Sequence, residues 1–176
     1  MNTGRVSRSN GGKCMRVVVG VWLVLFLLVS RAASAAPPAV PEHASVYSVV
    51  APSGSVLFEH TADQVRPPAS MIKLLMMLLV TEGLEQGKWS LDTEITASRN
   101  AQRMGGTQVY LNAGETHTLE NLMLAVSVAS ANDAAMAVAE GLWGSEAEYL
   151  DAANARAQEL GMSSSVFRSV HGLPPD

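Results

Sequence analysis

The sequence is organised around one short stretch, Pro68-Ala69-Ser70-Met71-Ile72-Lys73-Leu74-Leu75. Serine is favoured where a helix begins, so we predict a helix from Ser70 through the apolar run to about Glu82, with Gly83 or Gly87 as its end. Residues three apart share a helix face, so the Ser70 hydroxyl and the Lys73 amine are expected to meet. Apolar surroundings lower the pKa of a lysine, and a neutral amine beside a serine is a general base beside a nucleophile. Alone, the pattern also fits a helix cap followed by a lysine that reaches solvent.

The first 35 residues have the three parts of a secretory signal peptide. A basic start precedes an apolar run at 17–29, and small residues follow, ending in Ala33-Ser34-Ala35. The run is shorter than the roughly 20 residues of a membrane span, although an uncleaved anchor stays an alternative. We therefore expect an exported protein, in the periplasm or on the outer face of the cytoplasmic membrane. Residues 36–44, rich in proline and alanine, are expected to form a tether.

Composition excludes several classes of protein. Residues 36–176 hold seven Lys and Arg against all 16 Asp and Glu, a formal charge of −9, which disfavours nucleic-acid binding. The sole cysteine, Cys14, lies in the leader, so the mature chain has no cysteine nucleophile or disulfide. Its histidines are scattered without the spacing of metal ligands. We expect neither a metal nor a cofactor.

The rest of the chain alternates extended and helical patterns. Residues 45–50 and 55–59 are β-prone and joined by a turn, which predicts a hairpin. An extended segment is expected at 89–96 and an irregular loop at 98–110. Three more helices are predicted: the first from Thr118, the second from Ala134 to Gly141, and the third from Ser145 to Leu160, ended by Gly161.

A second group of polar residues, Ser130-Ala131-Asn132, falls between two predicted helices. A serine hydroxyl can carry a proton to a leaving amine, and an asparagine amide can hold a substrate backbone. These residues could therefore form the second wall of a cleft that contains Ser70 and Lys73. As an isolated tripeptide the group also fits a helix start, with Asn132 or Asp133 as the cap.

These motifs together resemble a known family. Ser70-x-x-Lys73 followed by Ser130-x-Asn132 resembles the first two signatures of serine penicillin-recognising enzymes. Two further stretches, 105–111 (Gly-Gly-Thr-Gln-Val-Tyr-Leu) and 171–173 (His-Gly-Leu), are similar to the D-alanyl-D-alanine carboxypeptidases, the low-molecular-weight penicillin-binding proteins. The resemblance implies an α+β fold of the β-lactamase/transpeptidase type, with a helical cluster packed on an antiparallel sheet. Residues 45–176 are then expected to be the N-terminal part of the catalytic domain.

The resemblance also implies a reaction. Ser70 attacks the carbonyl between the two terminal D-alanines of a peptidoglycan stem pentapeptide, and Lys73 accepts its proton. Ser130 relays a proton to the departing D-alanine, while Asn132 contacts the substrate amide and orients Lys73. Water then hydrolyses the acyl-enzyme, and penicillins and other β-lactams inhibit by stalling at that stage.

The sequence departs from the family pattern at one important place. No Lys-Thr-Gly, the third signature, follows Asn132. We therefore expect a chain that is incomplete at its C-terminus and inactive alone, with membrane association only through the missing C-terminus or an uncleaved leader. A serine β-lactamase and a non-catalytic peptidoglycan-binding relative are the alternatives.

Overall fold

The computed structural model describes residues 39–42, 44–50 and 52–173. The predicted signal peptide, residues 1–35, lies outside the described residues. The predicted tether, residues 36–44, is described at 39–42 and 44, which belong to no helix or strand. The chain divides after Ala62 into two compact units, and each is described by itself.

The first unit is a β-hairpin. Strand β1 (Val46–Val50) pairs antiparallel with β2 (Ser55–His60), and the register shifts between Ser48 and Val49. Gly54 has φ +69 in the connecting turn, a left-handed conformation that glycine adopts without steric cost. The predicted hairpin is therefore confirmed.

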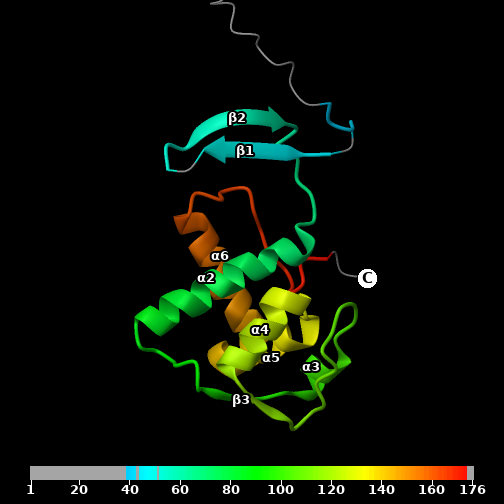
Figure 1. The fold of residues 1–176 in the computed structure, drawn as a ribbon, viewed down its shortest axis with the longest axis vertical. Helices are drawn as coiled ribbons and strands as arrows, with labels where there is room; N and C mark the ends of the chain where they lie inside the picture. Colours follow the sequence, from blue (N-terminus) through cyan, green and yellow to red (C-terminus); the bar gives the residue numbers. More distant parts are fainter. Residues whose placement is uncertain (1–38, 43, 51, 174–176) are drawn as a thin grey trace, which may run out of the picture. The chain divides into compact units, whose positions relative to one another are not determined.

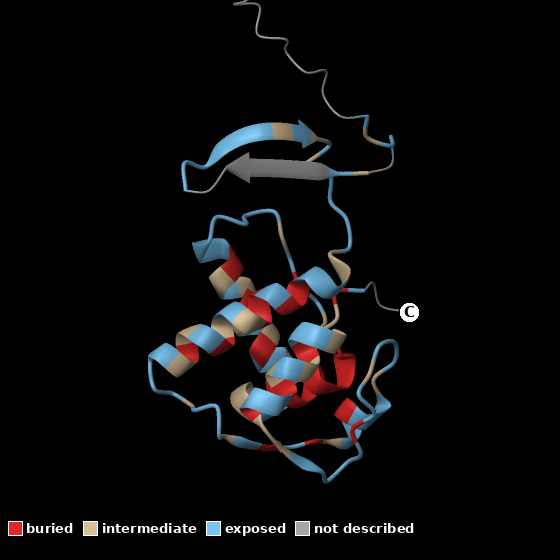
Figure 2. Ribbon diagram, viewed as in Figure 1, coloured by how far each residue is buried: buried red, intermediate tan, exposed pale blue. Residues whose placement is uncertain are grey.

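The second unit is a cluster of helices with a small sheet at its edge (Figure 1). Strand β3 (Glu94–Thr96) pairs antiparallel with β4 (Thr116–Thr118). The helical elements, in chain order, are η1 (Ala69–Met71), α2 (Ile72–Glu85), α3 (Arg99–Arg103), α4 (Leu119–Ala129), α5 (Asn132–Trp143) and α6 (Glu146–Glu159). Figure 2 shows the buried residues gathered in the interior of this cluster, with exposed faces outward.

Helix α5 is the centre of the second unit. It packs against α3, α4, α6 and β3, and every residue from 131 to 139 is buried. Four of these are alanines within the helix, whose short side chains let the neighbouring elements approach closely. The same closeness continues at Gly141, where an added Cβ would lie 2.5 Å from Ile95 Cγ2. The predicted end of this helix at Gly141 is therefore wrong, because glycine there serves packing instead of termination.

Helix α2 differs from its prediction at its start, and it ends just before Gly87, the later of its two predicted ends. A 3₁₀ turn contains Ser70, and the α-helix begins at Ile72 and passes Gly83 to Glu85. Gly83 is needed because the Trp89 ring lies against it; an added Cβ would come within 2.0 Å of Trp89 Cζ2. None of the helices in the described part of the chain is long and apolar enough to span a bilayer.

Burial of α2 is one-sided. One face is buried, while the side chains of Met71 and Leu74, at the helix start, are 66% and 64% exposed. A helix that is apolar on every side is ordinarily surrounded by a core, but within the described residues α2 has one exposed face.

Two smaller elements were not predicted. The expected loop at 98–110 contains α3, which Ser98 caps by accepting hydrogen bonds from the N–H groups of Asn100 and Ala101. The three residues of β4 follow the turn at Gly114 and reach α4, which Thr118 caps. Short elements such as these depend on their neighbours more than on periodicity.

Candidate active site

Ser70 occupies the middle of the exposed 3₁₀ turn η1. The alternative interpretation of Ser70 as a helix cap is wrong, because no side-chain cap bond is present at the start of η1 or α2. Ala69, directly before it, has φ +47, a left-handed conformation that is strained for a residue with a side chain. The Ala69 N–H donates to the Gly172 carbonyl at 3.0 Å, which ties the turn to the end of the described chain.

Lys73 lies one turn further and is 2% exposed. Its Nζ is 3.5 Å from Ser70 Oγ, so the two side chains meet on one face as expected. Nζ donates to Asn132 Oδ1 and to the Ser130 carbonyl, both at 2.6 Å, and lies 3.2 Å from Ser130 Oγ. The four residues singled out in the sequence, Ser70, Lys73, Ser130 and Asn132, therefore converge on a single amine.

Burial lowers the pKa of Lys73 below its ordinary value, because desolvation disfavours the ammonium form. The negative charge of Asp133 opposes this effect and raises the same pKa, but burial is the larger of the two. A lysine in such a position loses its proton more readily than one in water. The amine can then accept a proton from a neighbouring hydroxyl.

The connection between α4 and α5 brings the second wall of the site to Lys73. Only Ser130 and Ala131 separate the two helices, and Ser130 has φ +55. This left-handed residue reverses the chain sharply and turns both its carbonyl and its hydroxyl toward Nζ. Helix α5 begins at Asn132, with Ala131 in the cap position and no side-chain cap bond, so the alternative of an Asn132 or Asp133 cap is wrong.

Asn132 joins Lys73 to the loop that follows α3. Its Nδ2 donates to the Gly105 carbonyl at 2.7 Å while Oδ1 accepts from Lys73. Its backbone N–H donates to the Thr107 carbonyl at 2.7 Å. Gly106 must lack a side chain, since a Cβ there would come within 2.8 Å of Asn132 Nδ2. Gly106 thus serves close packing against the site.

Sequence reasoning missed two residues that support the site. Asp133, considered only as a cap, is 1% exposed and its carboxylate accepts hydrogen bonds from the loop after Thr107. Gly172 lies against the turn that carries Ser70: a Cβ there would come within 2.2 Å of the Ala69 carbonyl oxygen. For Asp133, an acid directly after the Ser-x-Asn motif was the available signal. For Gly172, nothing but the motif at 171–173 pointed to it.

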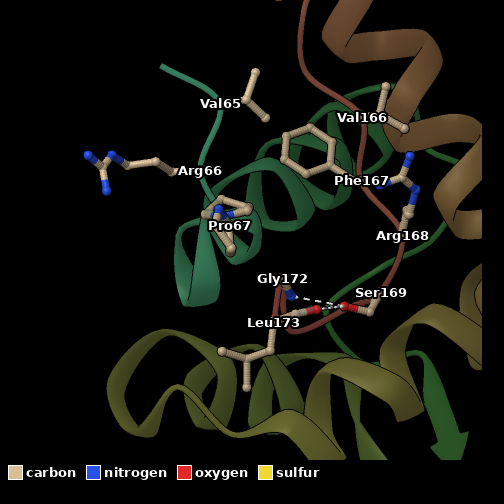
Figure 3. Close-up of a pocket in the computed structure, with 10 residues that line it drawn as sticks. Val65, Arg66, Pro67, Val166, Phe167, Arg168, Ser169, Gly172 and Leu173 are labelled. Carbon is tan, nitrogen blue, oxygen red and sulfur yellow. Dashed lines mark hydrogen bonds between the residues drawn. The ribbon is translucent and has the colours of Figure 1, made fainter. Parts of the chain in front are cut away.

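A hollow of about 230 Å³ lies beside the residues that lead into η1 (Figure 3). Residues 65–68 form one wall, and residues 166–169, 172 and 173 form the other. Figure 3 shows Phe167 between these walls and the Arg66 side chain directed away from it. The Gly172 N–H donates to Ser169 Oγ at 3.1 Å, which holds the second wall in its turn. This hollow has apolar sides and does not contain the four converging residues.

Metal chemistry has no obvious place within the described part of the chain. No group of three or more histidine, cysteine, aspartate or glutamate residues there is arranged to hold a metal ion. The site is made of hydroxyls, an amine and an amide, which are groups suited to nucleophilic catalysis.

Solved structures with this scaffold identify the class of protein. A D-alanyl-D-alanine carboxypeptidase from Francisella tularensis is 30% identical and superposes with a TM-score of 0.74, covering 85% of this chain and 37% of its own. Penicillin-binding protein D2 from Listeria monocytogenes, in its ampicillin-bound form, is 29% identical with a TM-score of 0.69, covering 80% and 56%. The predicted α+β fold of the β-lactamase/transpeptidase type is confirmed by these neighbours.

The chain belongs to the D-alanyl-D-alanine carboxypeptidase family, peptidase family S11, whose model matches residues 32–176. Among curated proteins, the D-alanyl-D-alanine carboxypeptidase DacF of Bacillus subtilis is 37% identical over 121 residues. That match covers 69% of this chain and 31% of the relative. The chain therefore spans about a third of the length of such relatives.

Proposed function

We propose that this chain carries the nucleophile and the base of a serine-type carboxypeptidase that removes the terminal D-alanine from peptidoglycan stem pentapeptides. Membership of the family supports the reaction class. The observation that supports the assignment of residues is the convergence on Lys73: a buried amine within 3.5 Å of Ser70 Oγ, held between Ser130 and Asn132.

In this proposal the neutral amine of Lys73 is oriented by its two short bonds. Its two N–H groups donate to the Ser130 carbonyl and to Asn132 Oδ1, both at 2.6 Å. The nitrogen lone pair then faces the hydroxyls of Ser70 and Ser130. An amine placed in this way accepts the Ser70 proton without turning.

Acylation follows from this arrangement. Ser70 Oγ forms a bond to the carbonyl carbon of the penultimate D-alanine, and its proton passes to Lys73 Nζ. The negative charge that develops on the carbonyl oxygen is stabilised by the Ser70 N–H and by the positive end of the η1–α2 helix. The proton then passes through the Ser130 hydroxyl to the nitrogen of the terminal D-alanine as the C–N bond breaks. Water hydrolyses the ester and restores Ser70.

Asn132 contacts both the base and the substrate in this mechanism. In the structure Oδ1 accepts from Lys73 and Nδ2 donates to the Gly105 carbonyl. An amide oxygen has two lone pairs and an amide nitrogen has two N–H groups, so one of each remains for a substrate backbone. The same reasoning extends the proposal to β-lactams, since a related penicillin-binding protein is solved in an ampicillin-bound form.

The signal-like N-terminus supports export, because peptidoglycan lies outside the cytoplasmic membrane. Its basic start, apolar run and small-residue end at 33–35 are those of a cleaved secretory leader. We place the mature protein in the periplasm or on the outer face of the membrane.

The test uses the product of the complete reading frame, whatever its length, with Ser70→Ala and Lys73→Ala as variants. Incubation with a fluorescent penicillin is expected to label the wild type on Ser70, located by peptide mass spectrometry, and a D-Ala-D-Ala pentapeptide is expected to release D-alanine. Ser70→Ala should lose the label entirely. Lys73→Ala should acylate about 10² to 10⁴ times more slowly, the usual contribution of a general base.

The pH dependence checks the base. Because the amine must be neutral to accept a proton, acylation should rise with pH until Lys73 is deprotonated, and this limb should lie below the ordinary lysine pKa of 10.5. Label that persists in Ser70→Ala would contradict the proposal. Rapid penicillin turnover without D-alanine release would favour the β-lactamase alternative, and pentapeptide binding without acylation would favour the non-catalytic one.

A further inference from the structure

Asp133 belongs to a buried polar group that the proposed reaction uses only in part. Among the side chains whose burial the structure describes, the buried polar ones are Lys73, Asn132 and Asp133. Lys73 and Asn132 have roles in the proposed mechanism, and Asp133, at 1% exposure, has none so far. A carboxylate is costly to bury unless hydrogen bonds or an opposite charge compensate it, so its partners indicate what it does.

The Asp133 carboxylate accepts hydrogen bonds from three backbone N–H groups. Val109 N donates to both carboxylate oxygens at 3.2 Å, and Leu111 N donates at 3.0 Å. The third donor is Ala134, at 2.9 Å, in the first turn of α5. The carboxylate thus joins the loop to the positive end of α5, where a negative charge is favourable.

Asn132 and Asp133 together bind the loop at alternate residues. Asn132 binds the carbonyls of Gly105 and Thr107, and Asp133 binds the N–H groups of Val109 and Leu111. The four bonds fall at every second residue of the backbone strip 105–111, so they tie the strip along its length to the start of α5. The strip is therefore positioned by two consecutive residues, the first of which also binds Lys73.

The strip contains one strained residue, and it lies between the two bonds to Asp133. Tyr110 has φ +61, a left-handed conformation that is unfavourable for a bulky side chain, and it is 79% exposed. The flanking N–H groups of Val109 and Leu111 are both held by the carboxylate. Because the exposed ring makes little packing contact, the Asp133 bonds are what maintain this conformation.

We propose that Asp133 is the positioning residue of this site: its carboxylate fixes the strip 105–111 on the first turn of α5, keeps the Asn132 amide against the Lys73 amine, and adds a negative charge at the residue next to Asn132. The effect of this role on catalysis rests on the proposed function. In that mechanism Asp133 touches neither the nucleophile nor the leaving group, and it acts through Asn132 and Lys73. Its geometric part stands on the hydrogen bonds alone.

The other groups around Lys73 leave Asp133 as the charge that acts on it. Ser70, Ser130 and Asn132 are uncharged. Glu82 lies about two and a half turns further along α2 and is paired with Arg156 of α6 at 2.7 Å. Replacing Asp133 with the isosteric asparagine therefore removes the charge and replaces one of the two acceptor oxygens with an N–H donor, with little change in volume.

The experiment measures Lys73 directly in the 176-residue chain. The sequence has three lysines, Lys13, Lys73 and Lys88, so the side-chain signals of ¹³C-labelled lysine are few, and Lys73→Arg identifies the relevant one. Wild type, Asp133→Asn and Asp151→Asn are titrated; Asp151→Asn removes one charge from an exposed position of α6. Amide hydrogen exchange at Val109 and Leu111 is followed in the same samples.

In Asp133→Asn the Lys73 pKa is expected to fall below its wild-type value, because the attraction that stabilises the ammonium is lost. Exchange at Val109 or Leu111 should accelerate about tenfold or more, since the bonds to these amides lose their charge-assisted character and one acceptor oxygen is replaced. Asp151→Asn should change neither quantity. A Lys73 pKa that is unchanged or raised in Asp133→Asn, or unchanged exchange, would overturn the positioning role; a purely structural residue would lower stability without moving the lysine titration downward.

If Asp133→Asn shows no cooperative unfolding transition, the coupling between Asp133 and Lys73 is tested in the wild-type chain alone. The Asp133 carboxyl ¹³C signal is expected to shift at the pH at which Lys73 loses its proton, and a signal that ignores this titration refutes the coupling. These readouts are independent of acylation. If the Lys73 pKa falls and amide exchange accelerates but penicillin does not label the protein, only the proposed function is contradicted. If penicillin labels Ser70 but neither effect appears, only the role of Asp133 is contradicted.

Discussion

Two turns, one before Ser70 and one at Ser130, adopt left-handed backbone at residues other than glycine, and they are held in opposite ways. Ala69, with φ +47, is held by the backbone of Gly172, through one hydrogen bond and a close approach that admits no Cβ. The turn at Ser130, with φ +55, lies beside the hydrogen bonds of Lys73 and Asn132. The turn that carries Ser70 is therefore positioned by steric fit, and Lys73 is positioned by polar contacts.

This difference means that the two sides should fail under different substitutions. Adding one methyl group should destabilise the turn that carries Ala69 and Ser70, because backbone approaches backbone there. Removing one polar group should destabilise the contacts of Lys73, because a buried group would lose its partner.

Gly172→Ala is expected to have the largest effect on stability. The residue has φ +66, and its new Cβ would lie within 2.2 Å of the Ala69 carbonyl oxygen, so both strain and collision oppose it. We expect a loss of about 3 to 4 kcal/mol in the free energy of unfolding, measured by urea denaturation. Gly161→Ala is the matched control, since Gly161 has φ +82 but nothing within 4 Å, and it should lose only about 1 kcal/mol. Equal losses would show that close approach to Ala69 does not matter.

Asn132→Ala is expected to come next. The substitution removes the acceptor of Lys73 and the donor to the Gly105 carbonyl, and it leaves a buried amine with fewer partners. We expect a loss of about 2 to 3 kcal/mol in the free energy of unfolding, together with slower acylation. Asn112→Ala, which breaks an exposed bond to Glu115, should lose less than about 1 kcal/mol. If the two variants were equally stable, the hydrogen bonds of Asn132 would not be what holds Lys73 in place.

The smallest expected effect concerns the strain at Tyr110. Glycine adopts φ +61 freely, so Tyr110→Gly should relieve strain, whereas Tyr110→Ala removes the same exposed ring and keeps the unfavourable backbone. We expect the glycine variant to be more stable than the alanine variant by about 1 kcal/mol in thermal or urea unfolding. An alanine variant as stable as the glycine variant would mean that the Asp133 bonds do not force this conformation.

Sequence reasoning found the parts of the site that depend on local spacing. Ser70 and Lys73 lie within one turn, and Ser130 and Asn132 lie in a two-residue connection between helices, so short-range geometry placed them correctly. The proximity of the two pairs was expected from the cleft hypothesis and agrees with the structure. Their catalytic roles stay predictions.

The supporting residues could not be found in this way, because their partners are distant in the sequence. Gly172 meets Ala69 across about a hundred residues, and Asp133 meets Val109 and Leu111 in a loop for which no regular pattern exists. The one-sided exposure of α2 has a similar cause. Its sequence is apolar all round, and only the packing of its neighbours determines which face is covered.

The tryptophan beside Gly83 makes the far end of α2 useful as an optical probe. Trp89 meets Trp143 edge-on with ring centroids 5.3 Å apart, and Trp143 meets Tyr149 in the same way at 5.2 Å. The Trp89 indole also donates to the Val80 carbonyl at 3.0 Å, so its fluorescence depends on α2, α5 and α6 staying together. Emission from this cluster therefore reports on the helical scaffold at the opposite end of α2 from Ser70. It can separate loss of the scaffold from a change confined to the turn that carries Ser70.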